Sequence, residues 1–220
     1  QSLAGKTAIV TAGSTVEPID SVRFIANHSS GKQGYAIAAA LAARGASVTL
    51  ISGPVTLTAP ATVNCVSVQT AMQMQAAVNA ALPADIAICA AAVADWRVAG
   101  SRHAKLKKSD HRAAAGMQLT LIENPDILAS LGQSDKRPSV LIGFAAETGD
   151  MLENATAKRH CKKCDWIIAN QVGAADDPVF GSDHNRITLI SETAVETWPR
   201  MLKTELADKL AERIAMEFLT

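Results

Sequence analysis

Residues 27–34, Asn27-His28-Ser29-Ser30-Gly31-Lys32-Gln33-Gly34, stand directly before an alanine-rich, helix-forming run that ends at Arg44. The first turn of a helix presents backbone N–H groups without partners inside the helix, together with the positive end of the helix dipole. The hydroxyls of Ser29 and Ser30 and the charge of Lys32 add donors, and the glycines let a ligand approach the backbone closely. A phosphate or carboxylate is therefore the expected ligand of this stretch.

The stretch matches neither of two common nucleotide motifs. It is not a P-loop, because no glycine stands five positions before Gly31 and Gln33 occupies the place of the Ser or Thr that follows the lysine. No G-x-G-x-x-G dinucleotide fingerprint follows the first predicted strand. An ordinary glycine-rich helix start remains the alternative to an anion site.

Around this stretch, short apolar runs alternate with segments of helical periodicity. Strands are predicted at 7–11, 47–52, 63–68 and 85–92, with helices at 34–44 and from Thr70 to about Leu82. This order predicts an α/β fold, a doubly wound, mostly parallel Rossmann-like sheet with helices on both faces. Ligands of such sheets bind beyond the carboxyl ends of the strands, here at Ala12-Gly13, Ser52-Gly53 and residues 92–95.

The second half continues the sheet with a longer polar interruption. Strands are predicted at 118–122, 140–146, 166–170 and 186–190, and helices at about 150–163 and 203–218. A further helix opens at Asn124-Pro125-Asp126, with Asn124 expected at the cap and Pro125 in the first turn. A single domain over residues 1–220 is the expectation, and Gln1 in place of methionine suggests a piece cut from a longer polypeptide.

Composition argues against several classes of function. Lys plus Arg and Asp plus Glu both number 21, so the net charge is zero and gives no electrostatic case for nucleic acid or an anionic membrane. No apolar run reaches the roughly 18 residues of a membrane span. The four cysteines form no secreted disulfide framework, which favours a reducing cytoplasm.

Two groups of cations lie near predicted strand ends. The segment after Asp95 holds Arg97, Arg102, Lys105, Lys107 and Lys108. We expect it to form a flap over a polyanion, and a solvated basic loop is the alternative. Lys158 and Lys162 are four residues apart, hence on one helix face, where they would bind phosphates as point charges or form a solvated surface.

Five segments in series carry a resemblance to a known family. They are residues 25–34, 91–97 (AAVADWR), 105–108 (KLKK), 124–128 (NPDIL) and 143–148 (GFAAET). In this order they resemble the bacterial phosphopantothenate–cysteine ligases, which form one half of a bifunctional coenzyme A biosynthesis protein. The resemblance also implies a flavin-dependent phosphopantothenoylcysteine decarboxylase domain on the same parent chain.

The resemblance implies a two-step, CTP-dependent ligation. The carboxylate of 4′-phosphopantothenate would attack the α-phosphate of CTP, and L-cysteine would then displace CMP from the acyl-cytidylate to form the amide. It also implies a requirement for Mg²⁺ and a homodimer in which each site borrows from the neighbouring subunit. The metal ligands remain unassigned, because Asp176-Asp177 and Asp183 lie in a loop without a readable pattern.

The resemblance also implies residue roles. Asn27 would hold the acyl-nucleotide, Arg23 would assist it, and Lys105 would act in catalysis as well as in nucleotide binding. The nucleotide-binding residues would be Ala92, Asp95, Lys105, Pro125, Asp126, Ile127, Leu128, Phe144, Lys158 and Lys162. Substrate phosphate or carboxylate would bind at Ser29, Ser30, Gly31, Lys32 and Gly34.

Two other functions stay open on the residues alone. An NAD(P)-dependent reductase of similar architecture would want an acidic residue after the second strand, where Ser52-Gly53-Pro54 stand. It would also favour a lysine four residues after a tyrosine, but Ala39 follows Tyr35. A nucleotide-binding module without catalysis is the remaining alternative.

Overall fold

A computed structural model describes residues 1–100, 118–147, 150–171 and 181–219. The central sheet is built from β1 (Thr7–Ala12), β4 (Ser47–Ser52), β5 (Asn64–Ser67), β6 (Ile86–Cys89), β9 (Val140–Glu147), β10 (Trp166–Gln171), β11 (His184–Ile190) and β12 (Val195–Leu202). Two short ladders stand apart from it, formed by β2 (Val16–Pro18) with β3 (Phe24–Ala26) and β7 (Trp96–Val98) with β8 (Leu121–Glu123). The helices are α1 (Lys32–Ala43), α2 (Ala71–Ala80), α3 (Ile127–Gly132), α4 (Met151–Lys162) and α5 (Lys203–Met216).

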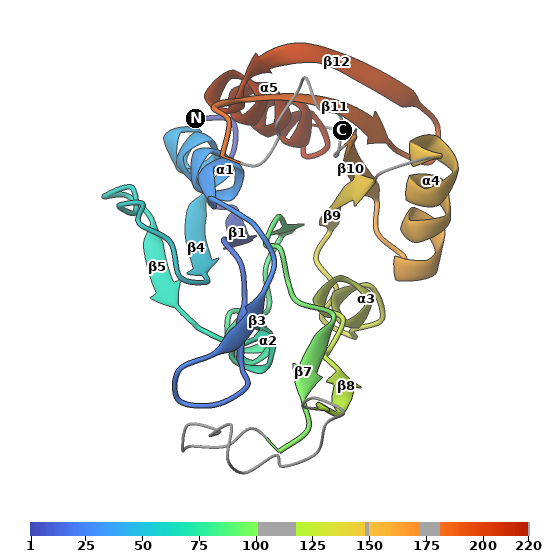
Figure 1. Cartoon of the computed structure of the whole chain (residues 1–220). Coiled ribbons are helices and arrows are strands. Elements are labelled where there is room, and N and C mark those ends of the chain that lie inside the picture. Colours follow the sequence, from blue (N-terminus) through green and yellow to red (C-terminus); the bar gives the residue numbers. More distant parts are fainter. Residues whose placement is uncertain (101–117, 148–149, 172–180, 220) are drawn as a thin grey trace.

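The strand order is β12-β11-β10-β9-β6-β1-β4-β5 (Figure 1). From β5 to β10 every neighbouring pair is parallel, and β11 and β12 add two antiparallel strands at one edge. The predicted mostly parallel, doubly wound sheet is confirmed. Its central strands are nearly continuous apolar runs because helices cover both of their faces.

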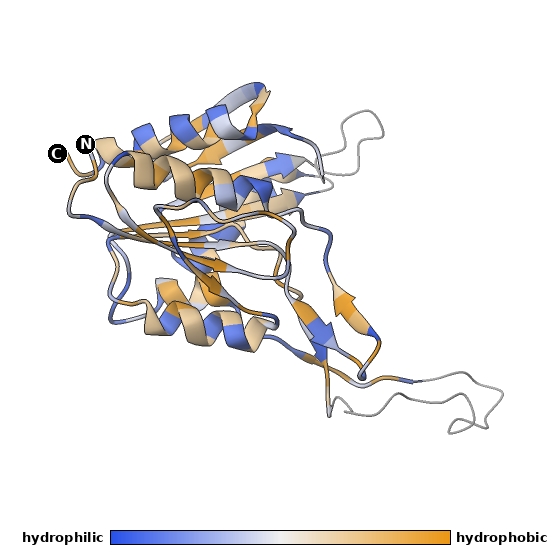
Figure 2. Ribbon diagram, turned by 90° about the vertical axis from the view of Figure 1, so that its left-hand side faces the viewer, coloured by the Kyte–Doolittle hydropathy of each residue, from blue (hydrophilic) through white to orange (hydrophobic). Residues whose placement is uncertain are grey.

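Helices pack on the two faces of the sheet, as the view in Figure 2 shows. On one face α1 and α5 bury Ile37, Leu41 and Leu210 against the strands. On the other face α2 and α3 contribute Met74 and Leu131, and α4 adds Ala155. No helix in the described ranges is long and apolar enough to cross a membrane.

The sequence did not predict β12. Only Trp198 of this strand is fully buried, and Pro199 follows it. Proline is tolerated at a sheet edge, where one side of the strand needs no hydrogen bonds. The strand predicted at 118–122 corresponds to β8, but it pairs with β7 outside the central sheet. The strands β2, β3 and β7 were missed, because strands of three residues are too short to show a period.

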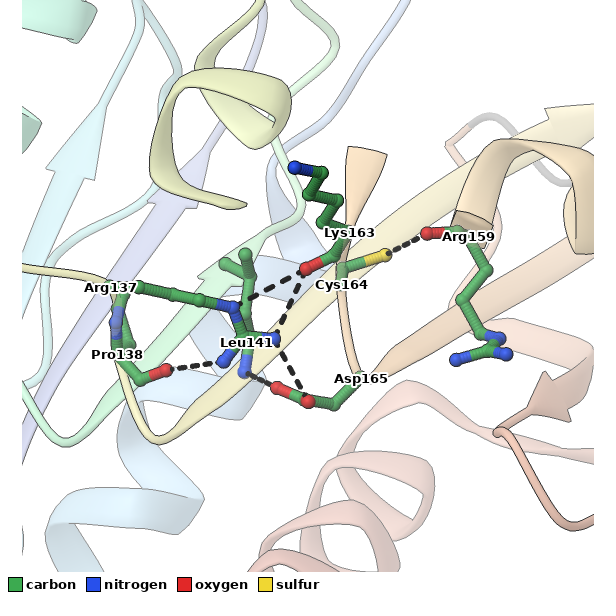
Figure 3. A network of polar contacts seen from close by, with 7 residues as sticks. All are labelled: Arg137, Pro138, Leu141, Arg159, Lys163, Cys164 and Asp165. Atoms are coloured by element: carbon green, nitrogen blue, oxygen red, sulfur yellow. Dashed lines mark hydrogen bonds and ion pairs between the residues drawn. The ribbon is translucent and has the colours of Figure 1, made fainter. Parts of the chain in front are cut away.

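A polar network fixes the sheet edge opposite the strand ends named above (Figure 3). The Arg137 guanidinium donates to the carbonyls of Pro138 at 2.9 Å and Lys163 at 3.1 Å, and to the Asp165 carboxylate at 2.9 Å. Asp165 also accepts from the backbone N–H of Leu141 at 2.7 Å. These contacts join the start of β9, the start of β10 and the end of α4, and so hold the end of α4 at the amino ends of these two strands.

Candidate functional site

The carboxyl ends of β1, β6 and β9 meet at one edge of the sheet. In the parallel registers Thr11 pairs with Cys89 and Cys89 pairs with Gly143. The residues that follow these strands in the chain therefore lie side by side. Two adjoining cavities open at this edge.

The first cavity, of about 470 Å³, lies between the segment after β6, the NPDIL segment and α4. Of the residues expected to bind a nucleotide, it is lined by Asp95, Pro125, Asp126, Ile127, Leu128, Phe144, Lys158 and Lys162. Thr11, Trp96, Glu123 and Asn124 also line it. The structure thus brings together residues that are up to 151 positions apart, from Thr11 to Lys162.

The start of α3 differs from the prediction. Asp126, not Asn124, is the N-cap, and its carboxylate accepts from the backbone N–H of Ala129 at 2.8 Å. Pro125 therefore precedes the cap and does not lie in the first turn. Asn124 instead donates through its side chain to the carbonyl of Ala94 at 2.8 Å. The expected cap was wrong because Asn124 is needed to hold this segment against the end of β6.

An ion pair lies in the wall of the first cavity. The ammonium of Lys162 hydrogen-bonds the carboxylate of Asp126. This hydrogen bond is the main cause that raises the pKa of Lys162, so its side chain stays charged at neutral pH. Lys158, one turn earlier on α4, lines the same wall.

The second cavity, of about 530 Å³, is lined by Ala26 and by the stretch quoted first, residues 27–34. The N-cap of α1 is Gly31, with φ of 75°, and no side chain caps this helix end. The backbone N–H groups of the first turn are therefore available to a ligand. Ser29, Ser30, Lys32 and Gly34 line this cavity, as expected of an anion site.

The structure gives a reason for glycine at positions 31 and 34 that the sequence did not reveal. A Cβ at Gly34 would lie 2.6 Å from Ala12 Cβ and 3.1 Å from the carbonyl oxygen of Thr11. A Cβ at Gly31 would lie 2.9 Å from a methyl of Val55, and its φ is left-handed. Close packing of α1 on β1 requires Gly34, and the left-handed φ together with the neighbouring Val55 side chain favours glycine at position 31, in addition to any approach of a ligand.

The two cavities share part of their walls. The residues that line both are Ala91, Val93, Asp95, Phe144 and Lys158. Asn27 stands at this junction, because its side-chain amide donates to the carbonyl of Val93 at 3.0 Å. Ligands in the two cavities would therefore meet beside Asn27 and Lys158.

The remaining expected residues lie elsewhere. Ala92 lines the second cavity and not the first. Arg23 lines neither cavity; its guanidinium pairs with the buried carboxylate of Asp20. Lys105, the rest of the predicted flap from Arg102 to Lys108, and Asp176-Asp177 lie outside the described residues.

Some lining residues were missed from the sequence. Asn170, Asn185 and Lys203 line the second cavity from β10, β11 and α5, more than 130 positions after the stretch that they face. Asn170 ends a buried apolar strand, which is a signal that the strand-end rule could have used. Asn185 and Lys203 carry no comparable local signal.

Comparisons with known proteins extend over nearly the whole chain. A model of the family described as "DNA/pantothenate metabolism flavoprotein C-terminal domain" matches residues 3–218. The chain is 45% identical over 214 residues to the coenzyme A biosynthesis bifunctional protein CoaBC of Escherichia coli (strain K12), covering 96% of this chain and 52% of that protein. It is 42% identical over 215 residues to the CoaBC protein of Haemophilus influenzae, with 97% and 52% covered. The chain thus spans about half the length of the curated relatives it matches.

Solved structures share the fold. The crystal structure of the C-terminal domain of a CoaBC protein superposes with a TM-score of 0.81 at 36% identity, over 99% of this chain and 97% of that one. A complex of the Cab2 mutant H337A with phosphopantothenate-cysteine has a TM-score of 0.74 at 16% identity, over 97% and 87% of the two chains. The second likeness concerns the fold alone.

Proposed function

Because the chain belongs to the DNA/pantothenate metabolism flavoprotein C-terminal domain family, we propose that it joins 4′-phosphopantothenate to L-cysteine with CTP, in coenzyme A biosynthesis. The observation that carries this proposal is the pair of cavities with a shared wall at Asp95, Phe144 and Lys158. A ligase that activates one substrate with another needs two such sites whose reacting ends meet. The CoaBC relatives are named as coenzyme A biosynthesis proteins, which agrees with this reading.

In the proposed first step, the nucleotide occupies the first cavity and the acid occupies the second. The carboxylate of the acid attacks the α-phosphate of CTP at the shared wall, and pyrophosphate leaves. No side-chain nucleophile is required, so catalysis rests on positioning the two substrates and on stabilising their charge. Lys158 and Lys162 supply cations for the phosphates, and Phe144 with residues 125–128 forms a surface for the base. Lys105 would bind the nucleotide and act in catalysis, as the resemblance of its KLKK segment implies.

In the proposed second step, the amine of cysteine attacks the acyl carbon and CMP leaves with the bonding electrons. Negative charge then develops on the acyl oxygen. The side-chain amide of Asn27 has two N–H groups. The contact with the carbonyl of Val93 fixes its orientation, and the second N–H remains to donate to that oxygen.

Magnesium is part of the proposal, and the described residues set limits on how it binds. They include no group of three or more His, Cys, Asp or Glu side chains that could hold a metal ion. Mg²⁺ usually keeps several waters and binds one or two carboxylates together with substrate phosphates. This chemistry fits Asp95, a carboxylate that lines both cavities. When bound, the ion would neutralise phosphate charge.

We also propose a homodimer and a decarboxylase domain on the parent chain. The loop between β2 and β3 and the two short ladders expose large apolar side chains: Val22, Phe24, Trp96, Leu121 and Ile122 are 40–60% exposed. Figure 2 shows apolar segments on the ladders, which project from the body of the domain. A patch of this kind is typical of a protein–protein interface. Arg23 lies in the same β2–β3 hairpin, where its guanidinium pairs with Asp20, and the proposed dimer would place this hairpin beside the site of the neighbouring subunit.

One assay separates this proposal from a reductase or a non-catalytic module. The protein is incubated with 4′-phosphopantothenate, L-cysteine, Mg²⁺ and either CTP, ATP or NADPH, while pyrophosphate release and NADPH absorbance are followed. We expect pyrophosphate with CTP, and less with ATP because a base pocket leaves buried groups unpaired with the wrong base. Silence with both nucleotides would refute the ligase, and NADPH oxidation would support a reductase.

A further inference from the structure

The second cavity contains a buried lysine that the proposed reaction has not used. Lys203 is the first residue of α5 and is only 7% exposed, yet its side chain lines the cavity. Its ammonium donates to the carbonyl of Ser182 at 2.6 Å. Lysine is rarely buried so completely in a folded protein unless it is paired, and the carbonyl that accepts from Lys203 here is a neutral partner. The part of the wall that holds Lys203 is not shared with the first cavity.

A second ammonium lies close to Lys203. Lys32, at the start of α1, donates to the Asp183 carboxylate at 2.6 Å and to the carbonyl of Gly181 at 3.1 Å. Burial of its ammonium, and then the positive charge of Lys32, lower the pKa of Lys203, and the charge of Asp183 offsets this only in part. Two ammonium groups, of Lys203 and Lys32, accompany the one carboxylate of Asp183, so these three side chains carry a net positive charge and would gain from an added anion.

Polar groups without partners point to a ligand at the same end. The side-chain oxygens of Asn185 and Gln33 are buried, and neither accepts a hydrogen bond from the described residues. Asn185, the second residue of β11, is 6% exposed and lines the same cavity as Lys203. An unpaired buried acceptor is costly, so a donor supplied by a ligand would remove this cost. The uncapped first turn of α1 adds backbone donors beside them.

The chemistry of the acid substrate matches these features, if the proposed function holds. Its carboxylate must reach the wall shared with the nucleotide, beside Asn27 and Lys158. Its phosphate is at the other end of the molecule and carries up to two negative charges at neutral pH. A hydroxyl group, which is both donor and acceptor, stands a few bonds from that phosphate.

We propose that Lys203 determines the selectivity for the phosphorylated acid: it binds the phosphate together with Lys32, while Asn185 accepts a hydrogen bond from the nearby hydroxyl. This inference deepens the proposed function and rests on it for the identity of the ligand. It assigns the discrimination between 4′-phosphopantothenate and pantothenate to a residue that is far from the glycine-serine stretch in sequence but lines the same cavity. The cost of burying the ammonium is the reason that it responds to a dianion and not to a neutral hydroxymethyl group.

Calorimetric titration with both acids tests the inference. Lys203→Met keeps the aliphatic stem and removes the charge, and it should weaken binding of 4′-phosphopantothenate by about 10- to 100-fold, the range of one charge-assisted hydrogen bond. Binding of pantothenate and CTP should stay as in the wild type. Lys209→Met is the matched control, because Lys209 lies on the same helix, is exposed and packs over the Trp198 ring. The quantity to compare is the ratio of the Kd values for pantothenate and 4′-phosphopantothenate. If this ratio in Lys203→Met is within about twofold of the wild-type ratio, the inference is overturned.

A second measurement uses the unaltered protein and covers the case in which Lys203→Met does not fold. Inorganic phosphate should compete with 4′-phosphopantothenate but bind together with pantothenate. Equal competition with both acids, or none with either, would contradict the assignment. These titrations need no turnover: a wild type that binds the phosphorylated acid selectively but releases no pyrophosphate would refute the proposed ligase while supporting the phosphate site.

Discussion

The ammonium of Lys162, in the last turn of α4, is hydrogen-bonded to the carboxylate of Asp126, the N-cap of α3. One carboxylate therefore serves a helix start and orients a cation toward the first cavity. One oxygen of the Asp126 carboxylate accepts a hydrogen bond from the backbone N–H of Ala129, and the other accepts one from the ammonium of Lys162.

Lys162→Gln should raise the KM for CTP by about 10- to 100-fold, because one charge-assisted contact to the triphosphate is lost. Helix α3 keeps its cap in this variant, so the melting temperature should change little. Lys163→Gln is the control, since that neighbouring side chain lines neither cavity. Equal KM values in steady-state kinetics of the two variants would show that Lys162 only holds Asp126.

Asn27→Ala should lower the overall rate by about 10²- to 10³-fold, the effect of removing one oxyanion donor. The loss should fall mainly on the second step, so quenched reactions should contain acyl-cytidylate after cysteine is added. CTP binding and the melting temperature should stay close to wild type. If the variant melts several degrees lower and its rate follows the folded fraction, the contact of Asn27 with Val93 is structural only.

Phe24→Asp tests the proposed dimer. The ring of Phe24 is 59% exposed in the single chain, and a carboxylate there would be desolvated by a partner without compensation. We expect a monomer in light scattering and a large loss of activity at unchanged secondary structure. Leu152→Asp, at a similarly exposed leucine on α4, should remain dimeric. A dimeric Phe24→Asp protein would exclude this surface as the interface.

Gly34→Ala should have two opposite effects on the free energy of unfolding, a gain in helix propensity and a loss from overpacking. Alanine is favoured over glycine by about 1 kcal/mol in a helix interior, and this is the upper bound for Gly34, which lies in the first turn of α1. The added Cβ would lie 2.6 Å from Ala12 Cβ, however, and backbone atoms of β1 are close behind it. Overpacking of this kind costs about 1–3 kcal/mol, so we expect a net loss of stability and a melting temperature lower by a few degrees. A higher melting temperature in calorimetry would mean that α1 moves away from β1 freely.

Asp85→Asn should show a stability effect that depends on pH. The Asp85 carboxylate accepts from the backbone N–H of Thr7 at 2.8 Å and from its hydroxyl at 2.9 Å. The backbone hydrogen bond is the main cause that lowers the pKa of Asp85 below its usual 3.8. A lowered carboxyl pKa stabilises the fold above the unfolded-state pKa, and this contribution is lost as the pH falls through the folded-state pKa.

Urea unfolding measures this effect. At pH 7 the variant should lose about 1 kcal/mol of unfolding free energy, since a partly exposed charge-assisted bond is replaced by a neutral one. The difference from the wild type should shrink as the pH falls below 3.8. If the difference in unfolding free energy between the variant and the wild type is the same at pH 7 and below pH 3.8, the effect is due to packing and not to the charge.

Local patterns were sufficient for most of the architecture. The apolar runs at 47–52 and 140–146 correspond to β4 and β9, and Thr70 caps α2 with Gln73 as a capping box. The alternation of strands and helices predicted the parallel sheet, and the strand-end rule predicted the edge at which the two cavities open. These features depend on residues that are close in the sequence, so they can be read from it.

Only the tertiary structure decided which side chains complete the cavities. Lys203 and Asn185 lie far from residues 27–34 in the chain, and packing of α5 beside α1 and of β11 beside β10 brings them to the second cavity. The cap of α3 is likewise Asp126 and not the predicted Asn124, whose side chain donates to the carbonyl of Ala94. The sequence by itself determined the α/β sheet, the family and the edge of the sheet where the two cavities open, because periodicity and motifs are local. The charges that face one another across that edge depend on long-range packing, which no local pattern encodes.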